Sequence, residues 1–262
     1  MTASSPNRAT VEVVGHRGAA AHHPGNGRAA FEAALAFGVD RVECDVQRAA
    51  DGALVLVHDE VVAFPDGRPR RVREATAEEL RRTRPDLLTL DELAVLVAGR
   101  ASLLIDVKRP GYEREVTAAI GRHRLASTAV VSTTHALVLR RLRAAHPALR
   151  LGLSTGHWAA GAPTPLARAA AAGLLRLLLP ALLPPALGLA GATEAMLHHR
   201  VATPRLVERV HRGGRRVYLW TVNEPGAIRR AIALGVDGVI SDRPDLVRRL
   251  LADTPPAGSA RS

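Results

Sequence analysis

The sequence is poor in cysteine and in aromatic residues. Of its 262 residues one is cysteine, Cys44, and only 3% are aromatic. A single cysteine excludes an internal disulfide framework and a cysteine-rich zinc site, and it fits a reducing cytoplasmic setting. With few aromatic side chains the chain lacks the stacking platforms of single-strand binders, so we expect no nucleic-acid partner. A basic nucleic-acid-binding protein is kept as an alternative, because the net charge is +11.

Lysine is almost absent as well. Lys108 is the only lysine among 36 basic residues, and the other 35 are arginine. Together with the abundance of Ala, Leu and Gly, this favours a general compositional bias over a dedicated basic surface. The single retained lysine is therefore informative about its own position.

The sequence also lacks a long uninterrupted apolar run. The longest uncharged apolar run, 177–192, contains Pro180, Pro184 and Pro185 and falls short of the ~20 residues of a membrane helix. The first ten residues carry no apolar signal core. We expect no signal peptide, no transmembrane helix and a cytoplasmic location. The Leu- and Ala-rich segment 169–187 is interpreted as a core-packing helix followed by a proline-rich loop. Contact with a membrane surface or an acyl chain is the less favoured alternative.

Short β-branched runs alternate with helical patterns along the chain, which is typical of a parallel sheet covered by helices. Eight such units in this length predict a (β/α)8 TIM barrel, and an open doubly wound sheet is the alternative. We expect a single domain over 11–252 between flexible tails, 1–10 and 253–262. The expected strands are 11–15, 39–45, 103–107, 129–133, 150–154, 195–198, 216–221 and 237–241.

One further strand-like run, 53–58, interrupts this alternation. It follows the second strand too closely for a parallel crossover, and Asp51-Gly52 is a hairpin signal. We therefore predict an antiparallel strand that sets His58 roughly opposite Asp45. The segment 60–73 contains Pro65 and Gly67, which predicts a loop.

Three carboxylates are expected at the carboxyl ends of neighbouring strands. Glu43 and Asp45 lie two residues apart on one strand and point to the same side, and Asp106 ends the next barrel strand. Such a group suits a hard cation, here one Mg²⁺ or Ca²⁺, with Mn²⁺ also acceptable. The alternative is that these acids form salt bridges with Arg17, Arg41 or Lys108.

Two histidines are expected at the same end of the barrel. His16 follows the first strand and His58 ends the hairpin strand. Imidazoles exchange protons near neutral pH, so the pair suits general acid–base catalysis. Arg17 and Lys108 add fixed positive charge suited to a phosphate. Trp220 at the end of the seventh strand can wall the pocket.

These motifs, taken in order, resemble the glycerophosphodiester phosphodiesterase family. The matching segments are His16-Arg17-Gly18, Glu43-Cys44-Asp45, His58-Asp59, Asp106-Val107-Lys108, Trp220-Thr221-Val222-Asn223 and Ser241-Asp242-Arg243-Pro244. The resemblance implies hydrolysis of glycerophosphodiesters or related lysophospholipids by a phosphodiesterase barrel of the phospholipase-C-like type. It implies a metal on Glu43, Asp45 and Asp106.

The resemblance also implies roles for the remaining site residues. His16 and His58 would be the acid and base, and Arg17 and Lys108 would contact the phosphate. In the family the substrate's own glycerol hydroxyl attacks phosphorus, and water then opens the cyclic phosphate. We expect Asn223 to cap the helix that follows it.

Three positions depart from the family pattern. Gly25 stands where the family usually has Glu, and Asp106 replaces a Glu, which shortens the reach by about 1.5 Å. Ser132-Thr133-Thr134-His135 replaces a common Ser-Ser-Phe-Asp motif. These changes bear on metal choice and substrate preference, and they leave a phosphate-ester-binding barrel with weakened catalysis as an alternative.

Overall fold

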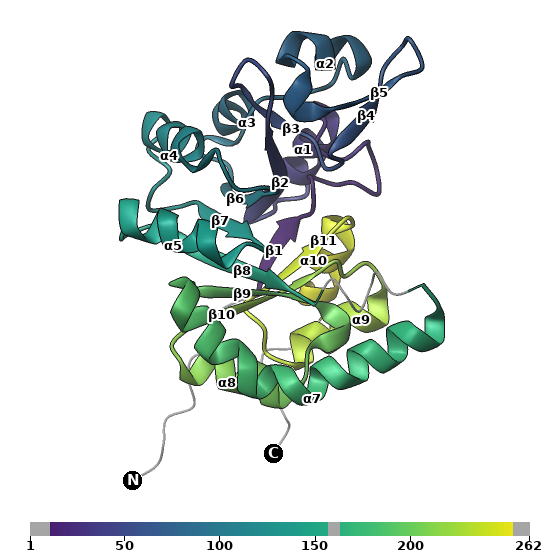
Figure 1. The fold of residues 1–262 in the computed structure, drawn as a ribbon. Helices are drawn as coiled ribbons and strands as arrows, with labels where there is room; N and C mark the ends of the chain where they lie inside the picture. Colours follow the sequence, from purple (N-terminus) through teal and green to yellow (C-terminus); the bar gives the residue numbers. More distant parts are fainter. Residues whose placement is uncertain (1–10, 157–162, 254–262) are drawn as a thin grey trace.

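Eight parallel strands close into a barrel within residues 11–156 and 163–253, the ranges described by the computed structural model (Figure 1). The first strand pairs with both the second and the last, which closes the ring and confirms the (β/α)8 barrel over the open sheet. Around the ring the strands are β1 (Glu12–Gly15), β2 (Arg41–Arg48), β6 (Ser102–Val107), β7 (Val130–Thr133), β8 (Arg150–Thr155), β9 (Glu194–His198), β10 (Arg216–Trp220) and β11 (Gly238–Ser241). The expected tail 1–10, and all of the expected tail 253–262 except its first residue, lie outside the described residues.

Helices cover the outside of the barrel (Figure 1). Two of them begin with a capping box, in which Thr76 and Thr89 accept from the backbone N–H of Glu79 and Glu92. The described helices are α1 (Arg28–Ala36), α2 (Ala77–Thr83), α3 (Leu90–Val97), α4 (Glu113–Arg122), α5 (Ala136–Ala145), α7 (Pro165–Ala190), α8 (Pro204–Arg212), α9 (Pro225–Ala233) and α10 (Pro244–Ala252), with short 3₁₀ turns η1 (Val72–Glu74) and η2 (His199–Val201).

The core has two layers because residues on each strand alternate between the helices and the barrel interior. On β2, Val42, Cys44 and Val46 point outward into the large cluster under the helices. A smaller cluster fills the barrel interior, with Leu104 and Met196 among its members. The inward-facing positions that this smaller cluster does not occupy carry the polar groups at the mouth.

The predicted antiparallel strand is present as β3 (Leu54–Leu56), paired with the end of β2. Val57 N–H donates to the Asp45 carbonyl, which brings His58 beside the mouth. The loop predicted over 60–73 is wrong in part, because β4 (Val61–Ala63) and β5 (Pro69–Arg71) form an antiparallel hairpin. Gly67 takes a positive φ of 75° at its turn, and Asp66 accepts from Arg68 N–H, so the turn residues close the hairpin.

The proline-rich loop expected after the Leu-rich helix is also wrong. Helix α7 runs unbroken through Pro180, Pro184 and Pro185. A proline at 184 cannot donate to the carbonyl of residue 180, but Arg209 Nε donates to it at 3.1 Å. This remote bond replaces the missing helical one. Helix α7 has 26 residues, and an 18-residue window within it has a mean hydropathy of 1.7, so α7 is long and apolar enough to cross a membrane by those two criteria.

A buried ionic cluster closes the end of the barrel opposite the mouth. Arg150 Nε donates to Glu194 Oε1 at 2.7 Å, and the Glu194 side chain is 1% exposed. Burial raises the pKa of Glu194 despite this partner. The second carboxylate oxygen of Glu194 has no hydrogen-bond partner among the described residues, so the cluster depends strongly on Arg150.

Replacing Arg150 by Met is therefore expected to destabilise the fold by about 3 kcal/mol, because it leaves a buried carboxylate unpaired. Urea unfolding followed by circular dichroism measures the change. Arg212→Met is the matched control, since the Arg212–Glu208 pair is 61% exposed on both sides and its loss should cost less than about 0.5 kcal/mol. Equal midpoints for the two variants would contradict the role given to Arg150.

Candidate active site

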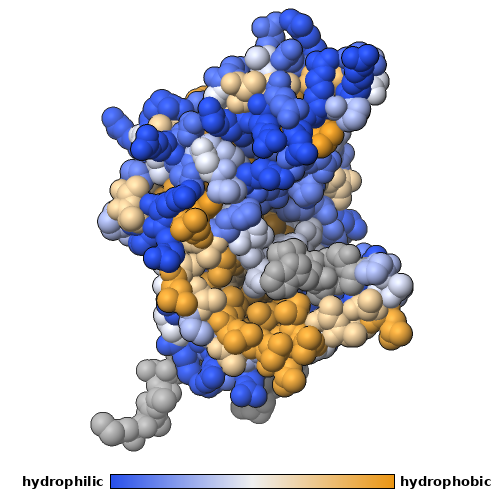
Figure 2. Space-filling view, in the orientation of Figure 1, coloured by the Kyte–Doolittle hydropathy of each residue, from blue (hydrophilic) through white to orange (hydrophobic). Residues whose placement is uncertain are grey.

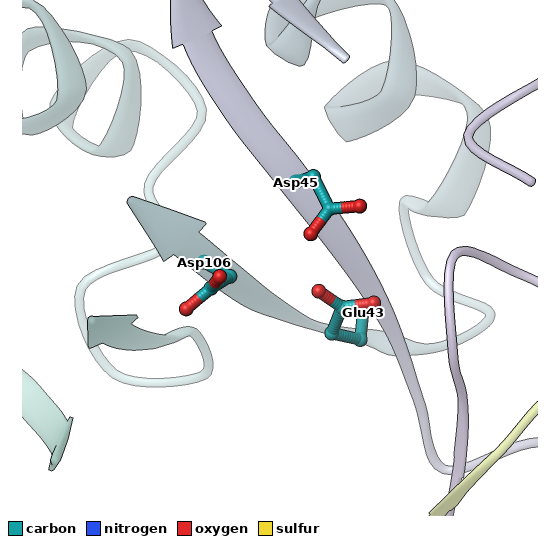
Figure 3. A group of neighbouring side chains, drawn as sticks. All are labelled: Glu43, Asp45 and Asp106. Atoms are coloured by element: carbon teal, nitrogen blue, oxygen red, sulfur yellow. The ribbon is translucent and has the colours of Figure 1, made fainter. Parts of the chain in front are cut away.

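Three carboxylates meet where β2 and β6 lie side by side. Glu43 and Asp45 point into the barrel from β2, and the parallel register sets Asp45 directly beside Asp106 of β6 (Figure 3). One oxygen from each of the three lies within 4.8 Å of the others. This confirms the predicted convergence of the three acids, which come from two strands separated by a long stretch of sequence.

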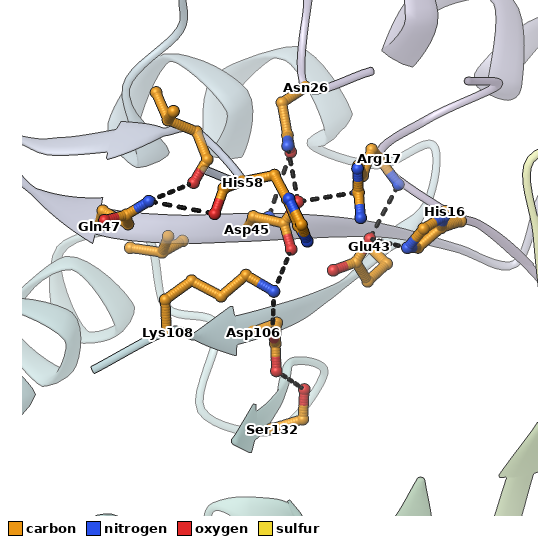
Figure 4. A network of polar contacts seen from close by, with 12 residues as sticks. His16, Arg17, Asn26, Glu43, Asp45, Gln47, His58, Asp106, Lys108 and Ser132 are labelled. Carbon is orange, nitrogen blue, oxygen red and sulfur yellow. Dashed lines mark hydrogen bonds and ion pairs between the residues drawn. The ribbon is translucent and has the colours of Figure 1, made fainter. Parts of the chain in front are cut away.

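Lys108 supplies positive charge inside this acidic group (Figure 4). Its Nζ lies 2.7 Å from Asp45 Oδ1 and 2.7 Å from Asp106 Oδ2. Although burial opposes it, the surrounding carboxylates of Asp106, Asp45 and Glu43 raise the pKa of Lys108. The alternative of internal salt bridges is thus realised for Lys108 and also for Arg17, which pairs with Asp45, whereas Arg41 pairs with Glu12.

Arg17 and Asn26 fix the β2 carboxylates from the loop after β1. Arg17 donates its backbone N–H to Glu43 Oε2 at 2.8 Å, and its Nε lies 2.9 Å from Asp45 Oδ2. Asn26 Nδ2 donates to the same Asp45 oxygen at 2.8 Å, and Asn26 Oδ1 accepts from the Asp45 N–H. The turn requires Gly18, whose φ is +83° and where a Cβ would lie 2.5 Å from Ala30 backbone atoms.

The two β2 carboxylates have opposite protonation tendencies. Burial and the neighbouring Asp45 raise the pKa of Glu43 to about 7. Burial would also raise the pKa of Asp45, but Lys108 and Arg17 outweigh it and hold that pKa at about 2. Glu43 thus tends to keep its proton because its charge would add to that of the neighbouring carboxylate. A divalent cation would relieve this repulsion, as expected of a group of oxygen ligands for a hard ion. The residues present therefore fit such an ion.

His16 is held in place by Asp242, which is itself held by the side-chain amide of Asn223. Its Nδ1 donates to Asp242 Oδ1 at 2.7 Å, which leaves Nε2 facing Glu43, 4.0 Å from Oε2. Burial opposes protonation, but the bond to Asp242 and the charge of Glu43 outweigh it and raise the pKa of His16. Asn223 donates to Asp242 Oδ2 at 2.5 Å and accepts from the Asp242 N–H.

The prediction that Asn223 caps α9 is therefore wrong. Glu224 occupies the N-cap position, and the side-chain amide of Asn223 donates a hydrogen bond to Asp242 instead. Asp242 itself was part of a recognised motif, but no role followed from sequence. The position after the last barrel strand was the available signal, because strand ends at the mouth meet each other.

His58 lies at the rim and is more exposed than His16. Its Nδ1 is 2.8 Å from Asp59 Oδ1. Gln47, the next inward position after Asp45 on β2, donates to the carbonyls of Val57 and Asp59 at 2.9 Å. Gln47 thereby positions the His58 segment, and its spacing of two from Asp45 was the signal that could have identified it.

A cavity of about 290 Å³ brings every predicted site residue together. Its lining combines the polar group at the mouth with an apolar floor that includes Leu104, Met196 and Ile240. The predicted residues in the lining are His16, Arg17, Glu43, Asp45, His58, Asp106, Lys108 and Trp220.

Trp220 forms one wall of this cavity. It packs edge-on against His198, with ring centroids 5.2 Å apart. Its Nε1–H is buried and has no hydrogen-bond partner among the residues that the structure describes. A buried donor without a partner beside the cavity is suited to a polar atom of a bound molecule.

Two departures from the family pattern have structural consequences. At Gly25 a Cβ would lie 3.0 Å from Arg17 Cβ, so a larger residue requires Arg17 to shift. Asp106, the shorter carboxylate, accepts from Ser132 Oγ at 2.9 Å, which aims its other oxygen at Lys108.

Asp242→Asn is expected to lower kcat by on the order of tenfold to a hundredfold, the range for groups that orient a functional imidazole. Loss of the carboxylate charge also lowers the His16 pKa, so the limb of the pH–rate profile that reports His16 moves to lower pH. Asp245→Asn is the control, because Asp245 contacts His22, which is absent from the cavity lining. A lower kcat with an unmoved limb would assign Asp242 a purely structural role.

A parallel barrel that carries a candidate metal-binding carboxylate cluster, imidazoles and cationic side chains at the carboxyl ends of its strands has the arrangement typical of a hydrolase active site. The chain belongs to the glycerophosphoryl diester phosphodiesterase family, whose model matches residues 16–246. It is accordingly a phosphoric diester hydrolase that acts on glycerophosphodiesters.

Individual relatives agree over nearly the whole chain. A glycerophosphodiester phosphodiesterase of Caldanaerobacter subterraneus subsp. tengcongensis is 28% identical and is covered over 97% of its length by 91% of this chain. The probable glycerophosphodiester phosphodiesterase 1 of Mycobacterium tuberculosis is 30% identical, with 95% of each chain covered. A crystal structure of the Thermotoga maritima glycerophosphodiester phosphodiesterase has the same fold, with a TM-score of 0.74 at 22% identity over 92% of this chain and 99% of that one.

Proposed function

We propose that this enzyme cleaves glycerophosphodiesters, and lysophospholipids that share the glycerol phosphate group, by histidine acid–base catalysis with one divalent cation. Glu43, Asp45 and Asp106 would hold Mg²⁺, Ca²⁺ or Mn²⁺. The single observation that carries the proposal is that these carboxylates, His16 and His58 line one cavity. A phosphodiesterase from Oleispira antarctica, 19% identical with a TM-score of 0.76 over 93% of this chain and 97% of that one, binds sn-glycerol-3-phosphate as its product.

The chain's own residues have distinct tasks in this proposal. Arg17 and Lys108 bind the phosphate oxygens, where their fixed charge stabilises the charge that develops in the transition state. Trp220 packs against the glycerol or alcohol group and offers its free N–H. The bound cation would lower the pKa of the attacking hydroxyl and draw charge from a phosphate oxygen.

The proposed reaction has two steps, and the two histidines exchange roles between them. In the first, one histidine takes the proton of the substrate's glycerol hydroxyl as its oxygen bonds to phosphorus. The other histidine gives a proton to the departing alcohol oxygen as the old P–O bond breaks. In the second, the roles reverse: water adds to the cyclic phosphate and the ring oxygen recovers a proton, which returns both histidines to their initial states.

The test is a substrate panel on chelator-treated enzyme. Glycerophosphocholine, glycerophosphoethanolamine and lysophosphatidylcholine are each incubated with Mg²⁺, Ca²⁺ or Mn²⁺. The released alcohol is quantified together with glycerol phosphate, or with acylglycerol phosphate for the lysophospholipid. We expect turnover to vanish after chelation and to return with at least one ion. Binding of glycerol phosphate without turnover under any ion would instead support a phosphate-ester-binding barrel with lost catalysis.

A further inference from the structure

Helix α7 exposes an apolar surface that no other described helix matches (Figure 2). Leu166, Leu177 and Leu189 are 80%, 73% and 79% exposed, and Leu174 and Leu182 are 58% exposed. Figure 2 shows apolar colour gathered over the part of the molecule where α7 runs in Figure 1. Exposed apolar patches of this kind mark sites of interaction with other proteins or with membranes.

The fold allows α7 to lie on a membrane but not to cross one. It is the crossover between the neighbouring barrel strands β8 and β9, which pair directly. Its other face, including Leu179, Leu183 and Leu187, is buried in the core beneath the helices. A helix fixed to the barrel along this face can offer lipid only its outer face, as interfacial helices do.

Charge around the patch selects the partner. α7 contains Arg168 and Arg176 and no acidic residue. The adjoining elements η2 and α8 add Arg200, Arg205, Arg209 and Arg212 against one acid, Glu208. A second copy docked face to face would set arginine against arginine, whereas anionic phospholipid complements both the leucines and the positive rim.

We propose that the outer face of α7 docks onto an anionic phospholipid surface. The chain enters α7 from the carboxyl end of β8, so the first turns of the helix lie on the mouth side of the barrel. At about 1.5 Å per residue the 26-residue helix is much longer than the 6-residue strand β8, so it extends along the whole side of the barrel. Docking thus sets the mouth close to the lipid. In combination with the proposed function, this favours phosphodiester head groups that reside in or leave the membrane.

Flotation with unilamellar vesicles tests the docking surface. We expect the full-length protein to bind palmitoyl-oleoyl phosphatidylglycerol vesicles and to bind phosphatidylcholine vesicles far less. Binding should weaken as salt rises from about 50 to 500 mM, because the charge attraction is screened. The double variant Leu177→Gln/Leu182→Gln should lower the partition coefficient about a hundredfold, roughly tenfold for each leucine withdrawn from lipid. Val95→Gln on α3, 69% exposed, is the matched control and should bind as the wild type does.

Two outcomes would overturn the proposal. One is equal vesicle binding by the wild type and the double variant, or none by either. The other is a concentration-dependent dimer, seen by sedimentation velocity, that the double variant abolishes while vesicle binding is absent. Turnover of water-soluble glycerophosphocholine is followed in parallel. It should be unchanged in the double variant, so a failure of docking is distinguishable from a failure of catalysis.

Discussion

Replacing His16 by Gln is expected to lower kcat on glycerophosphocholine by about three orders of magnitude. The wild-type imidazole is 16% exposed, is held through Nδ1 by Asp242, and directs Nε2 toward the carboxylate cluster. A positioned acid or base contributes about 10²–10⁴-fold, and glutamine removes the titratable nitrogens while keeping a polar side chain of similar size. Steady-state kinetics at saturating metal measures the loss.

His22→Gln is the matched control for this substitution. His22 pairs with Asp245 as His16 pairs with Asp242, but it lies outside the cavity lining. Its replacement should leave kcat within about twofold of wild type. A loss of less than tenfold in the His16 variant, with the control unchanged, would remove His16 from the proton transfers.

Leaving-group chemistry then separates the roles of His16 and His58. A p-nitrophenyl ester of glycerol phosphate releases p-nitrophenolate, which leaves without protonation, so its cleavage does not need the general acid. The variant that lacks the acid should recover most of its activity on this substrate, while the variant that lacks the base should not. Recovery in both variants, or in neither, would contradict the division of labour between the two histidines.

Much of the site could be predicted because strand periodicity is a local property. The alternation along β2 places Glu43 and Asp45 on one face, and the short connection to β3 forces an antiparallel return that carries His58 to the mouth. The second and third barrel strands, β2 and β6, pair in parallel although they are distant in sequence, and this pairing places Asp106 beside Asp45. These inferences need only residue spacing and connection length.

The features that sequence reasoning missed depend on partners far away in the chain. Asn223 resembles a helix cap locally, but Asp242 and Ser241 from the neighbouring strand end compete for its amide and prevail. The three prolines of α7 predict a break, and the helix continues because Arg209 on α8 supplies the donor that Pro184 lacks. Local propensity cannot predict such substitute hydrogen-bond partners, because the tertiary fold determines which distant residue supplies them.

Glu43→Gln is expected to stabilise the metal-free protein at neutral pH even though it removes activity. Burial and the neighbouring Asp45 oppose the charge of the Glu43 carboxyl and raise its pKa from an ordinary 4.5 to about 7 in the fold. A raised carboxyl pKa means that the folded state binds the proton more tightly, so stability falls as pH rises from about 4.5 through 7. Glutamine mimics the protonated acid and should abolish this slope. Urea midpoints in chelator at pH 5 and pH 8 measure it, with the exposed Glu78→Gln as control.

The same substitution should have the opposite effect once a divalent ion is added. A neutral amide offers the ion no charged oxygen, so affinity measured by calorimetric titration should fall at least a hundredfold, beyond the cost of altering a group that only orients a ligand. Turnover should fall by about three orders of magnitude, since the ion supplies several kcal/mol of transition-state stabilisation. A variant that is more stable without metal, yet neither binds the ion nor turns over substrate, would show that Glu43 is kept for chemistry at the expense of the fold. If the variant retained wild-type metal affinity, the ion would have to lie elsewhere in the cavity and the ligand assignment would be wrong.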